Sequence, residues 1–320
     1  MTPEAEKKQK FLAVLTVLFL FMLIGSLFYY IGVINRTRTD NLRNEVIRQK
    51  IEKEYAEKMN RINESNDPLP DIKAKSFLTI AIGDNDSKKI LAEKNSNLTL
   101  PIASVTKLMV AIITLENINL DTNIQATIDY IGQEESAFVL ETDRIYTAWE
   151  LLNNALVSSD NDSARLLSSA LGTDNFIKKM NDKARALGLT QTSYVNVTGL
   201  DPAEPTEAMN VSTANDLASL LIYIKNNYPQ ILRVGLQTEY NFCDINNYCK
   251  IVTATNKLLN NKNLQFRIIG GKTGSTDFSQ KNLVLLTEIF NDVSLVNIVL
   301  GAEDNFSDSL SLINNVKITN

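Results

Sequence analysis

The sequence of 320 residues contains no histidine and only two cysteines, Cys243 and Cys249. Without histidine the chain cannot form a Ser-His-Asp or Cys-His relay, and it cannot supply imidazole to zinc. Two thiolates are too few for a zinc site, and the sequence shows no cluster of carboxylates that would hold a hard cation. Hydrolysis by this chain must therefore use Ser, Thr, Lys, Asp or Glu, and we expect neither a metal nor another cofactor.

An excess of basic residues is also lacking, because 32 Lys and Arg face 37 Asp and Glu, for a net charge of -5. Such a chain offers no extended basic surface to a phosphate backbone, so nucleic acid is not an expected partner. Its 44% hydrophobic and 22% charged residues are typical of a globular protein with a core, which excludes disorder throughout.

Residues 11–33 form an apolar run without a charged residue, long enough to span a bilayer as a helix. A buried core helix and a cleaved signal peptide are the alternatives, but the run exceeds the usual signal length and no A-x-A-like cleavage site follows it. We expect an uncleaved anchor. Its orientation is not set by charge, because basic residues stand on both sides: Lys7, Lys8 and Lys10 before it, and Arg36, Arg38 and Arg43 after it.

The segment after this run is rich in charge and carries apolar residues at helical spacing: Val46, Ile47, Ile51, Tyr55, Met59 and Ile62. This pattern predicts a helical stalk to about Asn66, either solvated alone or paired with a second copy in a short coiled coil. Asn66-Asp67-Pro68-Leu69-Pro70 should break the helix. We therefore expect a cytoplasmic tail (1–10), an anchor (11–33), a charged stalk and linker (34–70) and a catalytic domain (71–320).

The remaining chain predicts strands, then helices, then strands, then a closing helix. The expected strands are 76–83, 90–93, 238–243, 248–254, 266–275, 282–290 and 294–300. Helices are expected at 104–117, 147–158 and 173–187, from 212 or 213, and from about 307, with Leu310, Leu312, Ile313 and Val316 facing the sheet. This order predicts an α+β domain whose antiparallel sheet joins both ends of the chain.

Three short motifs occur once each in this domain: Ser104-Val105-Thr106-Lys107, Ser159-Asp160-Asn161 and Lys272-Thr273-Gly274. A serine and a lysine three residues apart at a helix start lie on one face, so the amine reaches the hydroxyl. Apolar surroundings would lower the pKa of Lys107 and let it accept the proton of Ser104. The alternative is a helix-capping serine beside a solvated lysine, which is the better interpretation of such a motif standing alone.

The other two motifs also admit a structural alternative. Ser159-Asp160-Asn161 follows the predicted helix 147–158, so its side chains should project from a loop, unless they only terminate that helix in an Asx turn. The strand with Lys272-Thr273-Gly274 follows two glycines that permit close approach of another backbone. There Lys272 and Thr273 would hold a terminal carboxylate, although an exposed lysine that protects an edge strand would be the preferred interpretation if this motif stood alone.

The three motifs together resemble those of β-lactamases and penicillin-binding proteins. The likeness is greatest to the serine D-Ala-D-Ala carboxypeptidases of the low-molecular-weight penicillin-binding proteins (peptidase family S11), over roughly 72–320. Similar segments surround the motifs: 95–107, 159–164, 180–189, 196–201, 212–221, 256–259 and 271–276. The resemblance implies the penicillin-recognising fold of DD-peptidases and β-lactamases, an antiparallel sheet flanked by helices with the site between sheet and helical block.

The resemblance also implies roles for residues of this chain. Ser104 would be the acylated nucleophile and Lys107 its base, while Ser159 would relay a proton to the leaving group. The substrate would be bound by Asn161, Lys272, Thr273, Gly274 and Ser275, with the N–H groups of Ser104 and Ser275 as the oxyanion hole. Two departures stand out: Ser279-Gln280 replaces a usual Ala-Gly pair, and the carboxy-terminal β-rich domain and amphipathic anchor of well-known members are missing.

The expected function is removal of the terminal D-alanine from peptidoglycan stem pentapeptides by a serine-type carboxypeptidase that β-lactam antibiotics inhibit covalently. A D,D-endopeptidase that cleaves cross-links and a non-catalytic penicillin-binding sensor remain alternatives. A class A β-lactamase is disfavoured because Glu204 to Asn210 does not supply an E-x-x-L-N loop. The domain should lie outside the cytoplasm on a single-pass anchor, and there Cys243 and Cys249 would form a disulfide across a hairpin, unless both thiols are free.

Overall fold

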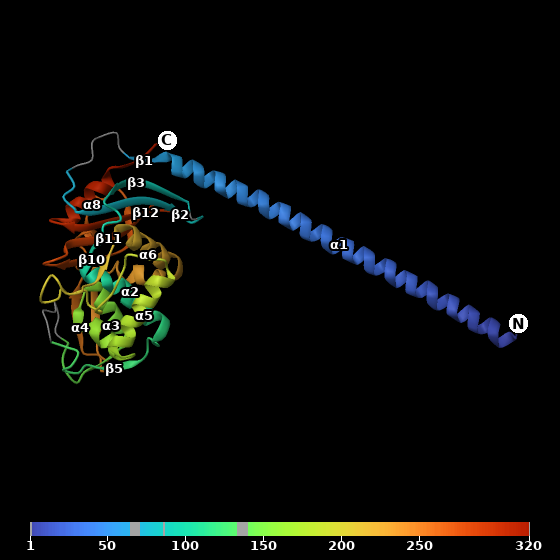
Figure 1. Cartoon of the computed structure of the whole chain (residues 1–320), viewed down its shortest axis with the longest axis horizontal. Helices are drawn as coiled ribbons and strands as arrows, with labels where there is room; N and C mark the ends of the chain where they lie inside the picture. Colours follow the sequence, from blue (N-terminus) through green and yellow to red (C-terminus); the bar gives the residue numbers. More distant parts are fainter. Residues whose placement is uncertain (1, 65–70, 86, 133–139, 320) are drawn as a thin grey trace. The chain divides into compact units, whose positions relative to one another are not determined.

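The computed structural model describes residues 2–64, 71–85, 87–132 and 140–319 (Figure 1). The chain divides into two compact units, Met1–Lys58 and Met59–Asn320. The first unit is part of a single long helix, α1 (Pro3–Arg61), and every described strand belongs to the second.

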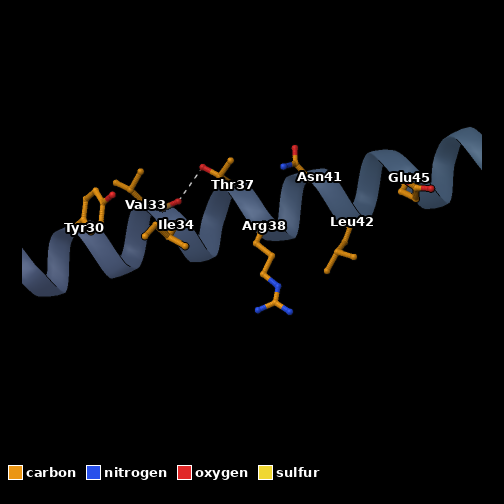
Figure 2. Close-up of a pocket in the computed structure, with 8 residues that line it drawn as sticks. All are labelled: Tyr30, Val33, Ile34, Thr37, Arg38, Asn41, Leu42 and Glu45. Atoms are coloured by element: carbon orange, nitrogen blue, oxygen red, sulfur yellow. Dashed lines mark hydrogen bonds between the residues drawn. The ribbon is translucent and has the colours of Figure 1, made fainter.

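Helix α1 runs without a break through the predicted anchor and most of the predicted stalk. All its described side chains as far as Glu54 are exposed, including the apolar ones of 11–33. Of the helices described, α1 alone is long and apolar enough to cross a membrane. Figure 2 shows its stretch from Tyr30 to Glu45, where a shallow hollow lies between side chains of α1. Because residues of this one helix line the hollow, it cannot enclose a ligand.

The predicted extent of the stalk helix is wrong at its end. The helix stops at Arg61, and β1 (Ile62–Glu64) pairs antiparallel with β13 (Val316–Ile318). Ile62 is fully buried there, and the ammonium of Lys89 lies 2.6 Å from its carbonyl oxygen. Burial of a β-branched side chain and a paired strand thus replace the last helical turn. The predicted helix breaker at 66–70 lies outside the described residues.

The second unit is built on one antiparallel sheet of five strands in the order β10-β11-β12-β2-β3. Its strands are β2 (Ser76–Gly83), β3 (Lys88–Lys94), β10 (Arg267–Thr276), β11 (Gln280–Phe290) and β12 (Val293–Ala302). The predicted antiparallel sheet that joins both ends of the domain is thereby confirmed. Strand β10, which carries Lys272-Thr273-Gly274, is one of its two edges.

Helices cover both faces of this sheet, as predicted (Figure 1). Along β12, Ile298 and Leu300 belong to the large core shared with the helical block, whereas Val299 packs with Leu312 of helix α8 (Asn305–Asn314) in a smaller cluster. Because alternate strand residues point to opposite faces, α8 and the helical block lie on opposite sides. The block comprises α2 (Lys107–Asn117), α3 (Ala148–Val157), α4 (Asn161–Ser169), α5 (Thr173–Ala186), α6 (Ala214–Asn227) and α7 (Pro229–Val234).

One short helix was not predicted, and one predicted boundary needs correction. Pro229 is the first residue of helix α7, a position that suits its fixed φ, and the strand predicted at 238–243 follows it as Glu239–Cys243. The closing helix α8 (Asn305–Asn314) starts earlier than predicted, because Asp304 caps it by accepting hydrogen bonds from the N–H groups of Phe306 and Ser307. Val316 is not on this helix but in β13.

Short strand pairs complete the unit. These are β4 (Leu100–Pro101) with β7 (Val211–Ser212), β5 (Asn123–Gln125) with β6 (Ile145–Thr147), and β8 (Glu239–Cys243) with β9 (Cys249–Thr253). The two cysteines face each other across the β8–β9 hairpin and form a disulfide. The predicted disulfide is therefore present, and the chain carries no free thiol.

Candidate active site

Ser104 lies at the start of the block's central helix. It belongs to a short 3-10 helix, η1 (Ala103–Thr106), which leads directly into α2. In a 3-10 helix, residues three apart lie one above the other, so Lys107 is directly beside Ser104. The two side-chain atoms, Lys107 Nζ and Ser104 Oγ, are 2.8 Å apart. The predicted pairing of the serine hydroxyl with the lysine amine is found.

Two glycines permit other backbones to reach this turn. A Cβ at Gly199 would lie 1.9 Å from the carbonyl oxygen of Ala103, and one at Gly274 would lie 2.7 Å from that of Ile102. Any side chain at either position would collide with the backbone next to Ser104. Gly274 therefore lets the edge strand β10 approach the backbone N–H of Ser104 closely.

The amine of Lys107 is completely surrounded. Only 1% of the residue is exposed, and its Nζ lies 2.7 Å from Asn161 Oδ1 and 2.9 Å from the carbonyl oxygen of Thr198, in addition to Ser104. Burial lowers the pKa of Lys107 to about 7, although the charge of Asp160 opposes the shift. At neutral pH a large fraction of this amine is therefore unprotonated and able to accept a proton.

The second motif lies at a junction between two helices. Ser159 adopts a left-handed conformation with φ of 66°, and Asp160 caps α4 by accepting a hydrogen bond from the N–H of Ser163. Asn161 is the first residue of α4. The predicted loop is thus correct for Ser159, whereas Asp160 and Asn161 begin a helix that the prediction did not recognise, because the motif was assigned only to the end of α3.

The third motif completes the site from the opposite side. Lys272 is 2% exposed, and its Nζ lies 2.7 Å from Ser159 Oγ and 2.9 Å from the carbonyl oxygen of Thr273. Burial, and then the charge of Lys107, hold the pKa of Lys272 well below 10.5. The protonated forms of Lys107 and Lys272 are therefore both disfavoured, and their amines contact the hydroxyls of Ser104 and Ser159 in one cleft.

Thr273 and Ser275 point to the opposite face of the sheet from Lys272, because side chains alternate along β10. The hydroxyl oxygen of Thr273 is 2.5 Å from that of Thr255, which follows the β8–β9 hairpin. Ser275 is exposed at the strand edge. Thr255 was not predicted as a site residue, and no local pattern marks it, since only the folding of the hairpin brings it to β10.

The loop of residues 196–201 was predicted only as a family-like segment, without a role in the site. Asn196 Oδ1 accepts hydrogen bonds from the N–H groups of Thr198 and Gly199, an Asx-type turn that the Asn-x-Thr-Gly pattern could have indicated. At its far end, Asp201 accepts hydrogen bonds from the Thr276 hydroxyl and the Phe278 N–H. The loop thus connects the partner of Lys107 to the turn after β10.

The unusual pair Ser279-Gln280 lies in this same turn. Ser279 is buried, and its hydroxyl is hydrogen-bonded to the N–H and the hydroxyl of Thr276. Gln280 has a φ of 57°, a left-handed conformation that glycine adopts without steric cost. The serine therefore adds hydrogen bonds to the end of the cleft, at a turn that holds glutamine in a strained conformation.

These residues surround a cleft of about 730 Å³. It is lined by Ser104, Ser158, Ser159, Asn161, Leu200, Asp201, Thr255, Thr273, Gly274, Ser275, Thr276, Asp277, Lys281, Asn305 and Phe306. The predicted site residues are all brought together, with the amines of Lys107 and Lys272 beneath the cleft wall. A nucleophile, a neutral amine and a strand edge able to pair with a peptide meet in this cleft, a combination suited to acyl transfer.

Comparisons with known proteins agree with this geometry. Residues 62–304 match the family Peptidase_S11, described as D-alanyl-D-alanine carboxypeptidase. A D-alanyl-D-alanine endopeptidase of Pseudomonas aeruginosa is 33% identical over 240 residues, which are 72% of this chain and 74% of that protein. The D-alanyl-D-alanine carboxypeptidase DacB2 of Mycobacterium tuberculosis is 31% identical over 218 residues, 68% of this chain and 71% of that one.

The fold has solved counterparts as well. Penicillin-binding protein D2 of Listeria monocytogenes, in its ampicillin-bound form, superposes with a TM-score of 0.66 at 25% identity. The superposition covers 78% of this chain and 99% of that one. The sheet flanked by helices on both faces is therefore the fold of the penicillin-binding DD-peptidases, as the sequence predicted.

Proposed function

This chain belongs to the S11 family of D-alanyl-D-alanine carboxypeptidases, and we propose that it removes the terminal D-alanine of peptidoglycan stem pentapeptides through an acyl-enzyme on Ser104. It is a serine-type peptidase, and its relatives include carboxypeptidases. The observation that carries the proposal is two sets of contacts in one cleft: the amine of Lys107 contacts Ser104 and Asn161, and the amine of Lys272 on β10 contacts Ser159.

The reaction starts with proton transfer from Ser104 to the neutral amine of Lys107. The Ser104 oxygen then bonds to the carbonyl carbon of the penultimate D-alanine, and the developing oxyanion accepts hydrogen bonds from the N–H groups of Ser104 and Ser275. When the C–N bond breaks, the proton passes through Ser159 to the nitrogen of the departing D-alanine. Water then attacks the ester carbon while Lys107 takes its proton, and Lys107 returns this proton to the Ser104 oxygen as the ester C–O bond breaks and the shortened peptide leaves.

The substrate lies along the edge of β10 in this proposal. Asn161 orients its amide, and the close approach permitted by Gly274 brings the strand within reach of Ser104. The hydroxyls of Thr273 and Thr255, which are 2.5 Å apart, together with Lys272 offer donors to a terminal carboxylate. This group distinguishes a carboxypeptidase substrate from an internal peptide bond.

β-Lactams are the proposed covalent inhibitors of the same serine. The support is the Listeria monocytogenes penicillin-binding protein D2, which is similar to this chain and was solved in its ampicillin-bound form. A second candidate activity is D,D-endopeptidase cleavage of cross-links, because the similar Pseudomonas aeruginosa protein is named an endopeptidase. Both activities use the same nucleophile and base.

We further propose that residues 11–33 of α1 anchor the chain in the cytoplasmic membrane. Residues 1–10 form the cytoplasmic tail, 34–70 the stalk and linker, whose strand β1 pairs with β13 of the domain, and 71–320 the extracytoplasmic catalytic domain. The apolar, exposed surface of α1 and the disulfide between Cys243 and Cys249 support this topology, since disulfides persist outside the cytoplasm. Protease added to intact spheroplasts should degrade the domain, and protection of the domain would reverse the orientation.

The activity is tested with the full chain in detergent, incubated separately with a stem pentapeptide and with a cross-linked muropeptide. Free D-alanine from the pentapeptide alone is the expected result, and cleavage of only the cross-linked substrate would select the endopeptidase. Ser104→Ala is the control for contaminating peptidases. Stable penicillin labelling without turnover of either substrate would favour the sensor alternative.

A further inference from the structure

The cleft has an unequal distribution of positive charge. The two motif lysines are buried, and their amines are engaged with Ser104, Asn161, Ser159 and carbonyl oxygens. Of the described residues that line the cleft, Lys281 alone is cationic. Its side chain is exposed, and within the described parts of the chain it makes no hydrogen bond or ion pair.

The register of the sheet places Lys281 close to Thr273. Lys281 on β11 is directly opposite Ser275 on β10, and Leu283 is opposite Thr273. Lys281 and Thr273 are therefore diagonal neighbours on one face, about 7 to 8 Å apart at the backbone and within reach of a long side chain. Lys272 points to the other face, where it meets Ser159, so the two lysines flank Thr273 from opposite sides.

We propose that Lys281 is a specificity-determining residue whose ammonium binds the substrate's terminal carboxylate at Thr273 from the α8 side of the sheet. The inference rests on the proposed function, because it assumes a substrate with a free carboxylate. One carboxylate oxygen accepts hydrogen bonds from the Thr273 and Thr255 hydroxyls, and the other lies between Lys281 and Lys272, which flank Thr273. The neighbouring cleft residues from α8, Asn305 and Phe306, carry no charge that would substitute for it.

Protection of a sheet edge does not explain this lysine. Lys281 is on β11, which is paired on both sides, whereas β10 and β3 are the edges.

Two acidic residues also line this part of the cleft. Asp201 is occupied by Thr276 and Phe278, and Asp277 is exposed in the turn after β10. Because Lys281 is exposed and Lys272 is buried, an approaching carboxylate meets Lys281 first.

The test compares Lys281→Ala with Lys88→Ala, which removes the same charge from an exposed strand position at the opposite edge of the same sheet. The measured quantity is kcat/KM for a peptide ending in D-Ala-D-Ala and for the same peptide ending in D-alaninamide. For the carboxylate substrate, Lys281→Ala should lose about fivefold, as expected for one partly exposed ion pair. Lys281→Glu should lose more, and Lys281→Arg should retain activity within about twofold.

Hydrolysis of the amide substrate should be unaffected by Lys281→Ala, and Lys88→Ala should match the wild type on both. The preference of the wild type for carboxylate over amide should also decrease as ionic strength rises, more than in Lys281→Ala. Equal losses on both substrates, or wild-type values for Lys281→Ala, would overturn the assignment. If the wild type released no D-alanine and formed no penicillin adduct, the proposed function itself would fail, which is a separate result.

Discussion

The two units of this chain depart from the usual rule of burial in opposite directions. In Met1–Lys58 the helix exposes a continuous apolar surface from Phe11 to Val33. In Met59–Asn320 the fold buries two lysine side chains, Lys107 and Lys272, almost completely. Exposed apolar surface and buried ammonium groups are both unfavourable for a protein in water.

The difference shows that each departure has its own physical purpose. The apolar surface of α1 suits a solvent that is itself apolar, so its cost disappears in a bilayer. The buried lysines remain surrounded by protein, where the charged ammonium form is unfavourable. Their pKa values are therefore lowered, and the neutral amines can act as bases. The following predictions alter one side of this contrast at a time.

Removing the nucleophile should have the largest effect. Ser104→Ala should abolish the penicilloyl adduct and lower peptide turnover by about 10⁵-fold or more, because the neighbouring groups have no acyl acceptor to serve. Mass spectrometry of the peptides after benzylpenicillin treatment is the measurement. A penicilloyl group on any peptide without Ser104, or labelling that persists in Ser104→Ala, would contradict the assignment.

Lys107 should be the next most sensitive position. Lys107→Ala should slow acylation by about 10²- to 10⁴-fold while non-covalent penicillin binding partly remains, because only the proton acceptor is lost. In the wild type the acylation rate should rise with pH around 7 and level off above, since the neutral amine is the active form. Stopped-flow acylation across pH tests this, and a rate that falls as pH rises through 7 would contradict it.

Lys272 tests the other buried amine. Lys272→Met fills the same space without charge, and it should lower carboxypeptidase kcat/KM by about 30-fold or more through loss of the carboxylate contact. The variant should also unfold at higher denaturant than the wild type at neutral pH. The reason is that a lysine with a lowered folded pKa costs stability below its unfolded pKa of 10.5, and that cost decreases as pH rises toward it. Wild-type turnover of the pentapeptide would show that the carboxylate is held elsewhere.

The sequence predicted the sheet and the three motifs well because their signals are local. Ser76–Gly83 was predicted with the bounds that the structure has, as an apolar run ended by a turn. Helix α7, with six residues, is too short for a helical period to show. Strand β1 was read as helix because Ile62 continues the apolar spacing of α1, and only its pairing with β13 at the far end of the chain selects a strand.

The same distinction holds for the site. Ser104 and Lys107 are close in sequence, so their contact could be predicted from helix geometry alone. Thr255, Thr198 and Asp201 act through contacts with residues about 20 to 90 positions away, such as the bond from Lys107 to Thr198, and no pattern within their own segments reveals the partner. These residues required the structure.

The disulfide contributes to the second unit only and should have a smaller effect. Cys243 and Cys249 are six residues apart, and closing such a short loop contributes about 2 kcal/mol by the chain-entropy relation. Replacing both by serine should therefore lower the free energy of unfolding by up to about that amount. Turnover should change little, because Cys243 and Cys249 do not line the cleft. The measurement is urea unfolding of the wild type and of the double serine variant. An unchanged urea midpoint would show that the disulfide does not stabilise the domain.

The smallest effect on catalysis should come from removing the first unit altogether. A chain that starts at Met59 keeps the buried Met59 and Ile62 and the pairing of β1 with β13. Its kcat/KM for a soluble peptide should match that of the full chain within about twofold, while membrane association should be lost, since apolar burial in the bilayer is the only role we assign to α1.

A chain that starts at Asp71 is the matched control. It lacks β1, so it should lose about 3 kcal/mol of stability through the missing Ile62 contacts while keeping its cleft. Unfolding curves and D-alanine release, measured on both truncated chains, separate the two units. A large loss of turnover in the chain from Met59, despite a stable fold, would show that α1 takes part in catalysis, and the contrast between an anchor and a catalytic unit would no longer hold.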